Sequence, residues 1–65
     1  MEYRIREGKV FSVTKRRGNR ERASKGVTYE WVWANRLEAF VTLGIEEYRK
    51  ASQEEIVLAR LAGEL

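Results

Sequence analysis

The chain of 65 residues contains no cysteine, no histidine and no aspartate. Without cysteine it cannot form disulfides or thiolate metal sites, and without histidine it lacks the commonest metal ligand and acid–base group. Its apolar runs span only a few residues, so we expect neither a signal peptide nor a membrane span. A chain of this length forms one domain and buries only about 60% of its unfolded surface. Self-association is the means of stabilisation that this composition leaves open.

The sequence also contains no catalytic motif. A phosphate-binding loop, a dinucleotide fingerprint and a nucleophile elbow are absent, and the glycines are scattered. The adjacent carboxylates Glu46-Glu47 and Glu54-Glu55 would not face each other on a helix, so they do not make a catalytic dyad. We therefore expect a protein that is not an enzyme and that holds no metal or cofactor.

Charge is abundant but unevenly distributed along the chain. Residues 1–26 hold nine Lys or Arg against three Glu, a net charge of +6, whereas residues 27–65 hold four against seven, a net charge of −3. A basic half joined to an acidic half predicts a polyanionic partner, and a merely solubilising surface is the alternative. The lack of cysteine is typical of the cytoplasm, and the wealth of Glu, Lys and Arg is typical of a thermophile.

The N-terminal residues predict a β-hairpin with strands at about 2–7 and 9–16. In YRIREGKVFSVTK, apolar residues alternate with polar ones at Tyr3, Ile5, Phe11 and Val13. A three-residue connection places all four on one face, whereas a two-residue connection places Ile5 opposite Val10 and turns Phe11 to the other face. We expect the three-residue register, because a slip by one residue reverses every side chain. The opposite face then carries Arg4, Arg6, Ser12, Thr14 and Arg16.

A basic segment, KRRGNRERASKG, follows at residues 15–26. Its Gly18-Asn19 pair predicts a second tight hairpin, and a long loop is the alternative. In both cases we expect a mobile arm that projects into water. Arginine grips phosphate oxygens in pairs through its planar fork. The arm and the basic strand face therefore form the predicted nucleic-acid-binding site, which comprises Arg4, Arg6, Lys15, Arg16, Arg17, Arg20, Arg22 and Lys25.

The segment VTYEWVW predicts a strand at about 27–34, because it is dense in β-branched and aromatic residues. One face of this strand carries Val27, Tyr29, Trp31 and Trp33. These rings suit a stacking platform for unpaired bases, or a core packed against a following helix. We expect the core role, since a small chain needs its large aromatic residues inside, with Trp31 or Trp33 left partly exposed.

Two helices are predicted after the sheet, at about 36–50 and 53–62. Asn35 with Glu38, and Ser52 with Glu55, form capping-box patterns at their starts. The first helix has one apolar stripe, formed by Leu37, Phe40, Val41, Gly44 and Tyr48. The second has apolar residues on more than one side, at Ile56, Val57, Leu58, Leu61 and Leu65. This surplus predicts a homodimer through residues 53–65.

The stretch RLEAFVTLGIEEYRKA, residues 36–51, resembles the S4 RNA-binding motif in its Arg-Leu start, its Leu-Gly and its later Arg. It departs from that motif in the spacing from Phe40 to Gly44 and in the absence of the strand that should follow. The likeness covers about a quarter of the chain, and we assign no family from it. The order of three strands and a helix is also similar to the DNA-reading sheets of phage integrase arm-binding domains, an analogy of topology and charge.

The sequence therefore predicts an α+β fold, with a small three-stranded antiparallel sheet followed by two C-terminal helices. We expect a small cytoplasmic protein that binds DNA or RNA without catalysis and grips the phosphate backbone, such as a regulator from a phage, virus or plasmid. The alternative is a protein–protein interaction module or inhibitor that binds an acidic protein surface. A membrane partner is not expected, because anionic lipid would repel the Glu-rich helices.

Overall fold

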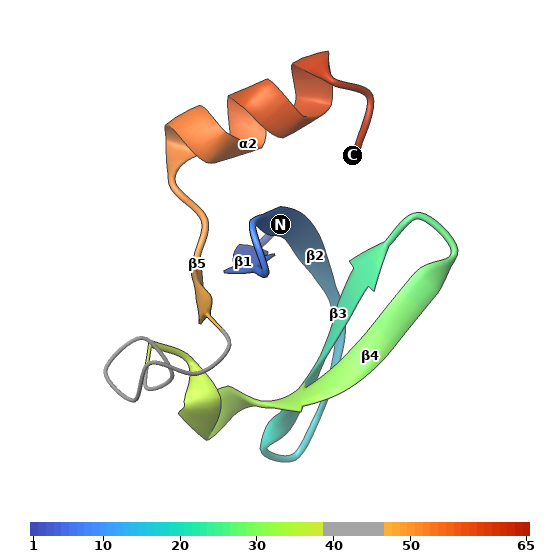
Figure 1. The fold of residues 1–65 in the computed structure, drawn as a ribbon. Coiled ribbons are helices and arrows are strands. Elements are labelled where there is room, and N and C mark those ends of the chain that lie inside the picture. The colour runs from blue at the N-terminus through green and yellow to red at the C-terminus, as the bar shows by residue number, and fades with distance from the viewer. Residues whose placement is uncertain (39–46) are drawn as a thin grey trace.

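The computed structural model describes residues 1–38 and 47–65 and consists mostly of one β-sheet (Figure 1). Its five strands are antiparallel and lie in the order β4-β3-β2-β1-β5. They are β1 (Tyr3–Arg6), β2 (Lys9–Arg17), β3 (Arg20–Lys25), β4 (Thr28–Trp33) and β5 (Tyr48–Lys50). The described residues contain one 3-10 helix, η1 (Ala34–Arg36), and one α-helix, α2 (Gln53–Leu61).

The predicted fold of three strands and two helices is therefore wrong. The three predicted strands correspond to β1, β2 and β4, but two further strands form in segments predicted to be an arm and a helix. The segment 15–26 supplies the end of β2 and all of β3, and Arg17 pairs with Arg20 across the turn. A hairpin at Gly18-Asn19 is thus confirmed, within the sheet. The sequence RERASK gave no strand signal, because it has no β-branched or large apolar residue.

The predicted helix at 36–50 is also wrong where the structure describes it. Asn35 lies inside η1 instead of capping an α-helix, and the backbone N–H of Glu38 donates to the carbonyl of Tyr48 at 2.6 Å. Strand β5 pairs with β1, and the side chain of Tyr48 is buried. Tertiary pairing here overrides a local helical pattern. The predicted stripe residues Phe40, Val41 and Gly44 lie outside the described residues.

This result also removes the two resemblances noted in the sequence. A strand at 48–50 occupies the end of the stretch that resembled the S4 motif, where the apolar stripe had predicted a helix. A sheet of five strands, with its last strand beside its first, differs from three strands followed by a helix.

The β1–β2 hairpin has a two-residue turn, so the expected three-residue register is wrong. Glu7 and Gly8 both have positive φ, 52° and 73°, as in a type I′ turn, and Ile5 lies opposite Val10. The expectation assumed that one face of the hairpin is buried and the other wet. In the structure Ile5 and Val10 pack with Ala59 of α2 on one face, and Arg4 is buried on the other.

The curl of the sheet brings side chains from separated strands together. Arg4 of β1 reaches Glu21 of β3 across β2, and Arg6 of β1 reaches Glu30 of β4 across two strands. Right-handed twist that accumulates across the strands produces such curvature. We call the side that holds these contacts the inner face and the opposite side the outer face. Tyr48 of β5 also lies on the inner face, where it contacts Glu21.

A β-bulge interrupts β2 between Val13 and Lys15. Val13 pairs with Ala23 and Lys15 pairs with Arg22, which leaves Thr14 as the extra residue. Regular alternation had placed Arg16 on one face with Ser12 and Thr14. The bulge reverses that alternation, so Arg16 lies on the inner face and its neighbours in sequence lie on the outer face.

Helix α2 begins at the predicted capping box, which is confirmed. The Ser52 hydroxyl accepts the N–H of Glu55 at 3.2 Å, and the Glu55 carboxylate accepts the N–H of Ser52 at 2.9 Å. Arg49 of β5 donates two bonds, of 2.8 and 2.7 Å, to the same carboxylate and ties the helix to the sheet. Ala59 is the buried residue of this helix, and several of its larger apolar residues stay exposed.

Candidate nucleic-acid interface

The outer face of β2, β3 and β4 carries cations and aromatic rings in adjacent positions. Strand pairing forms one row of Arg17, Arg20 and Trp33 and a second row of Lys15, Arg22 and Trp31. Tyr29 follows on the same side of β4. We call the four residues on β2 and β3 the cationic band, namely Lys15, Arg17, Arg20 and Arg22. The rings on β4 form the aromatic band, namely Tyr29, Trp31 and Trp33.

Each ring of the aromatic band has an arginine against it. The guanidinium carbon lies 4.4 Å from the ring centre for Arg20 and Trp33, 5.3 Å for Arg22 and Tyr29, and 5.7 Å for Arg17 and Trp31. Pairs within about 6 Å attract each other through the ring quadrupole. The Nε–H of Arg22 also donates to the hydroxyl of Thr14, the bulge residue, at 2.9 Å. These contacts orient the cations and the rings at the surface.

The aromatic band lies on the surface. Tyr29 is 60% exposed, Trp33 is 42% exposed, and Trp31 is half-buried. The expectation that the rings form the core is therefore wrong for Tyr29 and Trp33, whereas the expectation that one Trp stays partly exposed is confirmed. The hydrophobic cluster found among the described residues is small and lies where α2 covers the sheet, at Ile5, Val10 and Ala59, with Tyr3 packed against it. Among these residues, the aromatic one that is buried is Tyr48 of β5, not a member of the aromatic band.

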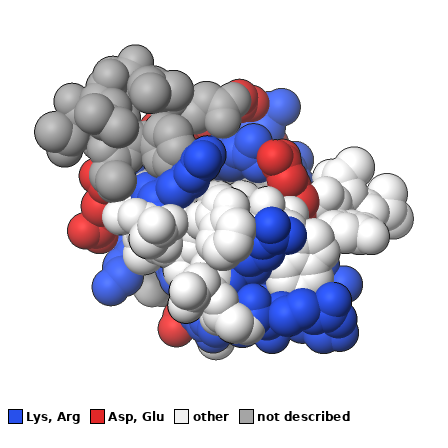
Figure 2. Space-filling view, turned by 90° about the horizontal axis from the view of Figure 1, so that it is seen from below, with Lys and Arg blue, Asp and Glu red and all other residues white. Residues whose placement is uncertain are grey.

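No carboxylate occurs on the outer face of the residues described in β2, β3 and β4. The acidic residues of these strands, Glu21 and Glu30, point to the inner face and bind Arg4 and Arg6. Within residues 1–38 and 47–65, no ion pair involves a member of the cationic band. Figure 2, a view from below, shows Lys and Arg side chains in blue beside uncharged surface in white, with Glu side chains in red among them. The cations are therefore available to an external anion.

Two of the predicted site residues, Arg4 and Arg6, lie on the inner face. Arg4 is 5% exposed, and its Nε–H donates to the Glu21 carboxylate at 2.9 Å. The hydroxyl of Tyr48 donates to the same carboxylate, and Arg6 binds Glu30. The two arginines of the predicted basic strand face are thus paired with carboxylates of the same chain. The curl of the sheet, which the sequence does not reveal, is the reason for the difference.

The Glu21 carboxylate is the centre of this buried cluster. Burial raises its pKa, but the hydrogen bonds from Arg4 and Tyr48 and the charge of Arg4 outweigh burial and leave the pKa below its usual range. Burial, together with the hydrogen bond to Glu21, raises the pKa of the Tyr48 hydroxyl. At neutral pH the carboxylate is therefore ionised and the hydroxyl is a neutral donor. The cluster joins β1, β3 and β5 and serves the fold.

Arg16 and Lys25 also lie outside the cationic band. The bulge turns Arg16 to the inner face, where its guanidinium binds Glu2 and lies 3.9 Å from Glu21. Lys25 is on the same side of β3 as Ala23, opposite Thr28 at the end of the hairpin. Four of the eight predicted site residues are therefore brought together, and these are the members of the cationic band.

Sequence reasoning missed the connection between the cations and the rings. The signal that could have found it is the alternation of Arg20 and Arg22, followed by the alternation of the three rings after a short turn. Gly26 has a positive φ of 61° in that turn, and Lys25 pairs with Thr28. Such a turn sets arginine and aromatic residues opposite each other on one face.

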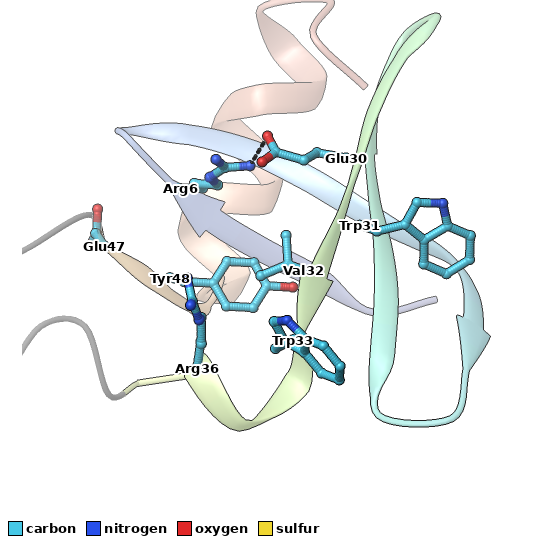
Figure 3. Close-up of a pocket in the computed structure, with 8 residues that line it drawn as sticks. All are labelled: Arg6, Glu30, Trp31, Val32, Trp33, Arg36, Glu47 and Tyr48. Carbon is cyan, nitrogen blue, oxygen red and sulfur yellow. Dashed lines mark hydrogen bonds and ion pairs between the residues drawn. The ribbon is translucent and has the colours of Figure 1, made fainter.

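A hollow of about 130 Å³ lies between β4 and β5, beside the aromatic band (Figure 3). Val32 and Tyr48 face each other there, and the Arg6–Glu30 ion pair lies above them. Trp31 and Trp33 also border the hollow, and the ring of Trp31 extends to the opposite side of β4. The charged groups of Arg6 and Glu30 bind each other, so they are not free to bind a ligand in the hollow. We interpret the hollow as the gap between the two edge strands, β4 and β5. The candidate site is therefore the outer face.

The described part of the chain has no group of His, Cys, Asp and Glu residues that could hold a metal ion. Among these same residues, no helix has the length and apolar character needed to cross a membrane.

No family model, curated protein or solved structure matches the chain. The function is therefore inferred from the chemistry of the outer face.

Proposed function

We propose that the chain binds nucleic acid through the outer face of β2, β3 and β4, without catalysing a reaction on it. One observation carries the proposal: the four residues of the cationic band share an acid-free surface with the rings of the aromatic band. Guanidinium groups donate paired N–H bonds to phosphate oxygens, and the Lys15 ammonium adds a compact charge. Binding then displaces counterions from the nucleic acid, so affinity falls steeply as salt is added.

An acidic protein surface is the alternative partner for this face. Its carboxylates would pair with the cationic band in the same way, and salt would weaken that pairing too. The exposed faces of Tyr29 and Trp33 favour nucleic acid, because every base offers a planar π-surface of matching chemistry. An acidic protein surface supplies carboxylates for the cationic band, but it need not supply aromatic groups that stack on Tyr29 and Trp33.

A charge-matched pair of variants tests the proposal. Lys15→Gln with Arg17→Gln removes two charges from the cationic band, and Lys9→Gln with Lys50→Gln removes two exposed charges that lie off the outer face. Affinity is measured against salt for duplex DNA and for single-stranded DNA and RNA. We expect the first pair to lower the salt slope by roughly one unit per lost phosphate contact and to weaken binding, with much less effect from the second. Equal effects of the two pairs would contradict the proposal.

We also propose that two chains pair through residues 53–65. Val57 is 43% exposed, Leu58 is 58% exposed and Leu61 is 80% exposed, so α2 presents apolar side chains that its own sheet does not cover. Burying one such side chain stabilises by about 1.5–3 kcal/mol. Figure 1 shows α2 at the top of the molecule and the β2–β3 turn at the bottom. Pairing through α2 would therefore leave the cationic band open and would join two such bands in one particle.

A further inference from the structure

We infer that the nucleic acid bound by the outer face is single-stranded, with its unpaired bases stacked on the aromatic band. The inference rests on the proposed function of the same face and names the class of nucleic acid. It follows from the placement of the cations relative to the rings, from the spacing of the rings, and from their exposure.

The two bands match the two parts of a single-stranded nucleic acid: the cationic band suits its phosphates and the aromatic band suits its bases. The cationic band lies on β2 and β3, and the aromatic band lies on β4, the next strand of the sheet. Neighbouring strands are about 4.8 Å apart, so the bands run side by side. A single strand lying along β4 would place its bases over the rings and its phosphates over the cations. A duplex keeps its bases stacked inside and presents phosphates and sugars to a flat surface, which leaves the rings without a planar partner.

The spacing of the rings fits a single-stranded nucleic acid in an extended conformation. Tyr29, Trp31 and Trp33 are alternate residues of β4, so consecutive rings are roughly 6.6 Å apart along the strand. That repeat is about twice the 3.4 Å rise per nucleotide of a stacked strand. Each ring therefore fits one base of a strand whose neighbouring bases are separated. Three rings correspond to about three nucleotides for each chain.

Trp33 and Tyr29 offer the largest free surfaces, at 42% and 60% exposure. Trp31 lies between them and is half-buried. Arg20 covers part of Trp33 from the neighbouring strand, directly across the ladder. The guanidinium holds the ring in place before binding, and it stays within reach of a phosphate when a base lies on the ring.

Fluorescence and anisotropy titrations of the intact chain test this inference. The probes are a dodecamer of dT, a dodecamer of U and a DNA duplex of the same length, all at one salt concentration. We expect both single strands to quench the Trp emission and to bind more tightly than the duplex. Trp33→Ala should weaken single-strand binding by about fivefold to a hundredfold, the range for loss of one base–aromatic stack, and leave duplex binding nearly unchanged.

Three further variants make the result specific. Trp33→Phe keeps a π-face and should retain most of the affinity, while the remaining emission then reports Trp31 alone. Tyr29→Ala should also weaken single-strand binding, and it provides a second test if Trp33→Ala does not fold. Val27→Ala removes an exposed apolar side chain from the turn before β4, outside the aromatic band and outside residues 53–65, and should leave binding of all three probes unchanged.

The outcomes separate this inference from the proposed function. If the duplex binds as tightly as the single strands, and Trp33→Ala and Tyr29→Ala change nothing, the single-strand inference is wrong. Binding that is nevertheless lost with Lys15→Gln and Arg17→Gln would still support the cationic band as a phosphate site. If none of the three probes binds the unmodified chain, both the inference and the proposed function are overturned.

Discussion

The guanidinium of Arg20 lies 4.4 Å from the ring centre of Trp33, its direct partner across the β3–β4 ladder. The pair lies at the surface, and among the described residues Arg20 is the one cation placed over this ring. A tryptophan in such a position contributes to the surface chemistry of the protein more than to its core. Stability and binding should therefore respond differently to its removal.

Trp33→Ala should lower the free energy of unfolding by less than about 2 kcal/mol. A large aromatic residue removed from a core costs about 3–5 kcal/mol, but Trp33 keeps 42% of its surface in water. Arg20→Ala should cost no more than about 1 kcal/mol, the range for an exposed cation–π pair. Urea unfolding followed by circular dichroism measures both. A loss above about 3 kcal/mol for Trp33→Ala would restore the core role that the sequence predicted.

Glu21→Gln should be destabilising by about 3 kcal/mol, the lower end of the range for breaking a buried pair, because it leaves the buried guanidinium of Arg4 with only the half-exposed Glu2 carboxylate as a counter-charge. Glu30→Gln is the matched control, since its carboxylate also binds an arginine but its side chain is 60% exposed. That control should cost less than about 1 kcal/mol. Thermal and urea unfolding of both variants give the comparison. Equal losses would show that burial of the Arg4–Glu21 pair does not matter to stability.

Acid should weaken the junction between β5 and α2. Hydrogen bonds from Arg49 and from the Ser52 backbone lower the pKa of Glu55 to about 2 in the folded chain, against an ordinary value of 4.5. Because the folded-state pKa is depressed, the stabilisation is present above about pH 5 and is lost as pH falls towards 2. The Glu55 side chain is 30% exposed, so salt should reduce the effect.

Glu55→Gln isolates this charge, since glutamine still fits the capping box. The unfolding free energy of this variant should fall less steeply between about pH 5 and pH 2 than that of the unmodified chain. Glu54→Gln, in the same helical turn, is the control, because it removes one carboxylate without touching the Arg49–Glu55 pair. Identical acid dependence of the unmodified chain and Glu55→Gln would remove Glu55 as the cause.

Sedimentation equilibrium at micromolar concentration should show a homodimer of about twice the 7.6 kDa chain mass. Leu61→Glu should give a folded monomer, because Leu61 is 80% exposed and its replacement disturbs no packing within the chain. Asn35→Asp adds the same charge at an exposed position in η1, outside residues 53–65, and should leave the dimer intact. A single 7.6 kDa species for the unmodified chain would mean that α2 does not pair with a second copy.

The sequence predicts three of the strands and the start of α2 because local and tertiary preferences agree there. Strands β1, β2 and β4 alternate apolar or aromatic residues with polar ones, and Ser52 with Glu55 forms a complete cap. Strand β3 has no such signal. Its place depends on Glu21 meeting Arg4, which is 17 residues earlier in the chain. Strand β5 carries a helical pattern that pairing with β1 overrides.

The candidate site was predicted only in part, because charge can be read from the sequence but the curvature of the sheet cannot. Charge alone identified the four members of the cationic band, but it also identified Arg4 and Arg6, which the curl of the sheet turns inward. The rings were expected to need a covering helix, whereas α2 covers the sheet at Ile5 and Val10 instead. Composition therefore predicts a kind of partner, and the curvature of the sheet decides which residues can meet it.

The bulge at Thr14 gives the two strands of the β2–β3 hairpin different tolerance to changes in length. Deleting Thr14 would leave Val13 opposite Ala23 and Lys15 opposite Arg22, with every later side chain on its present face. Its loss would remove only the hydroxyl contacts to Ser24 and Arg22. Strand β3 pairs with β4 without a bulge, so a deletion there would turn arginines away from the rings. Related chains that differ in length within this hairpin are therefore expected to differ in β2 rather than in β3.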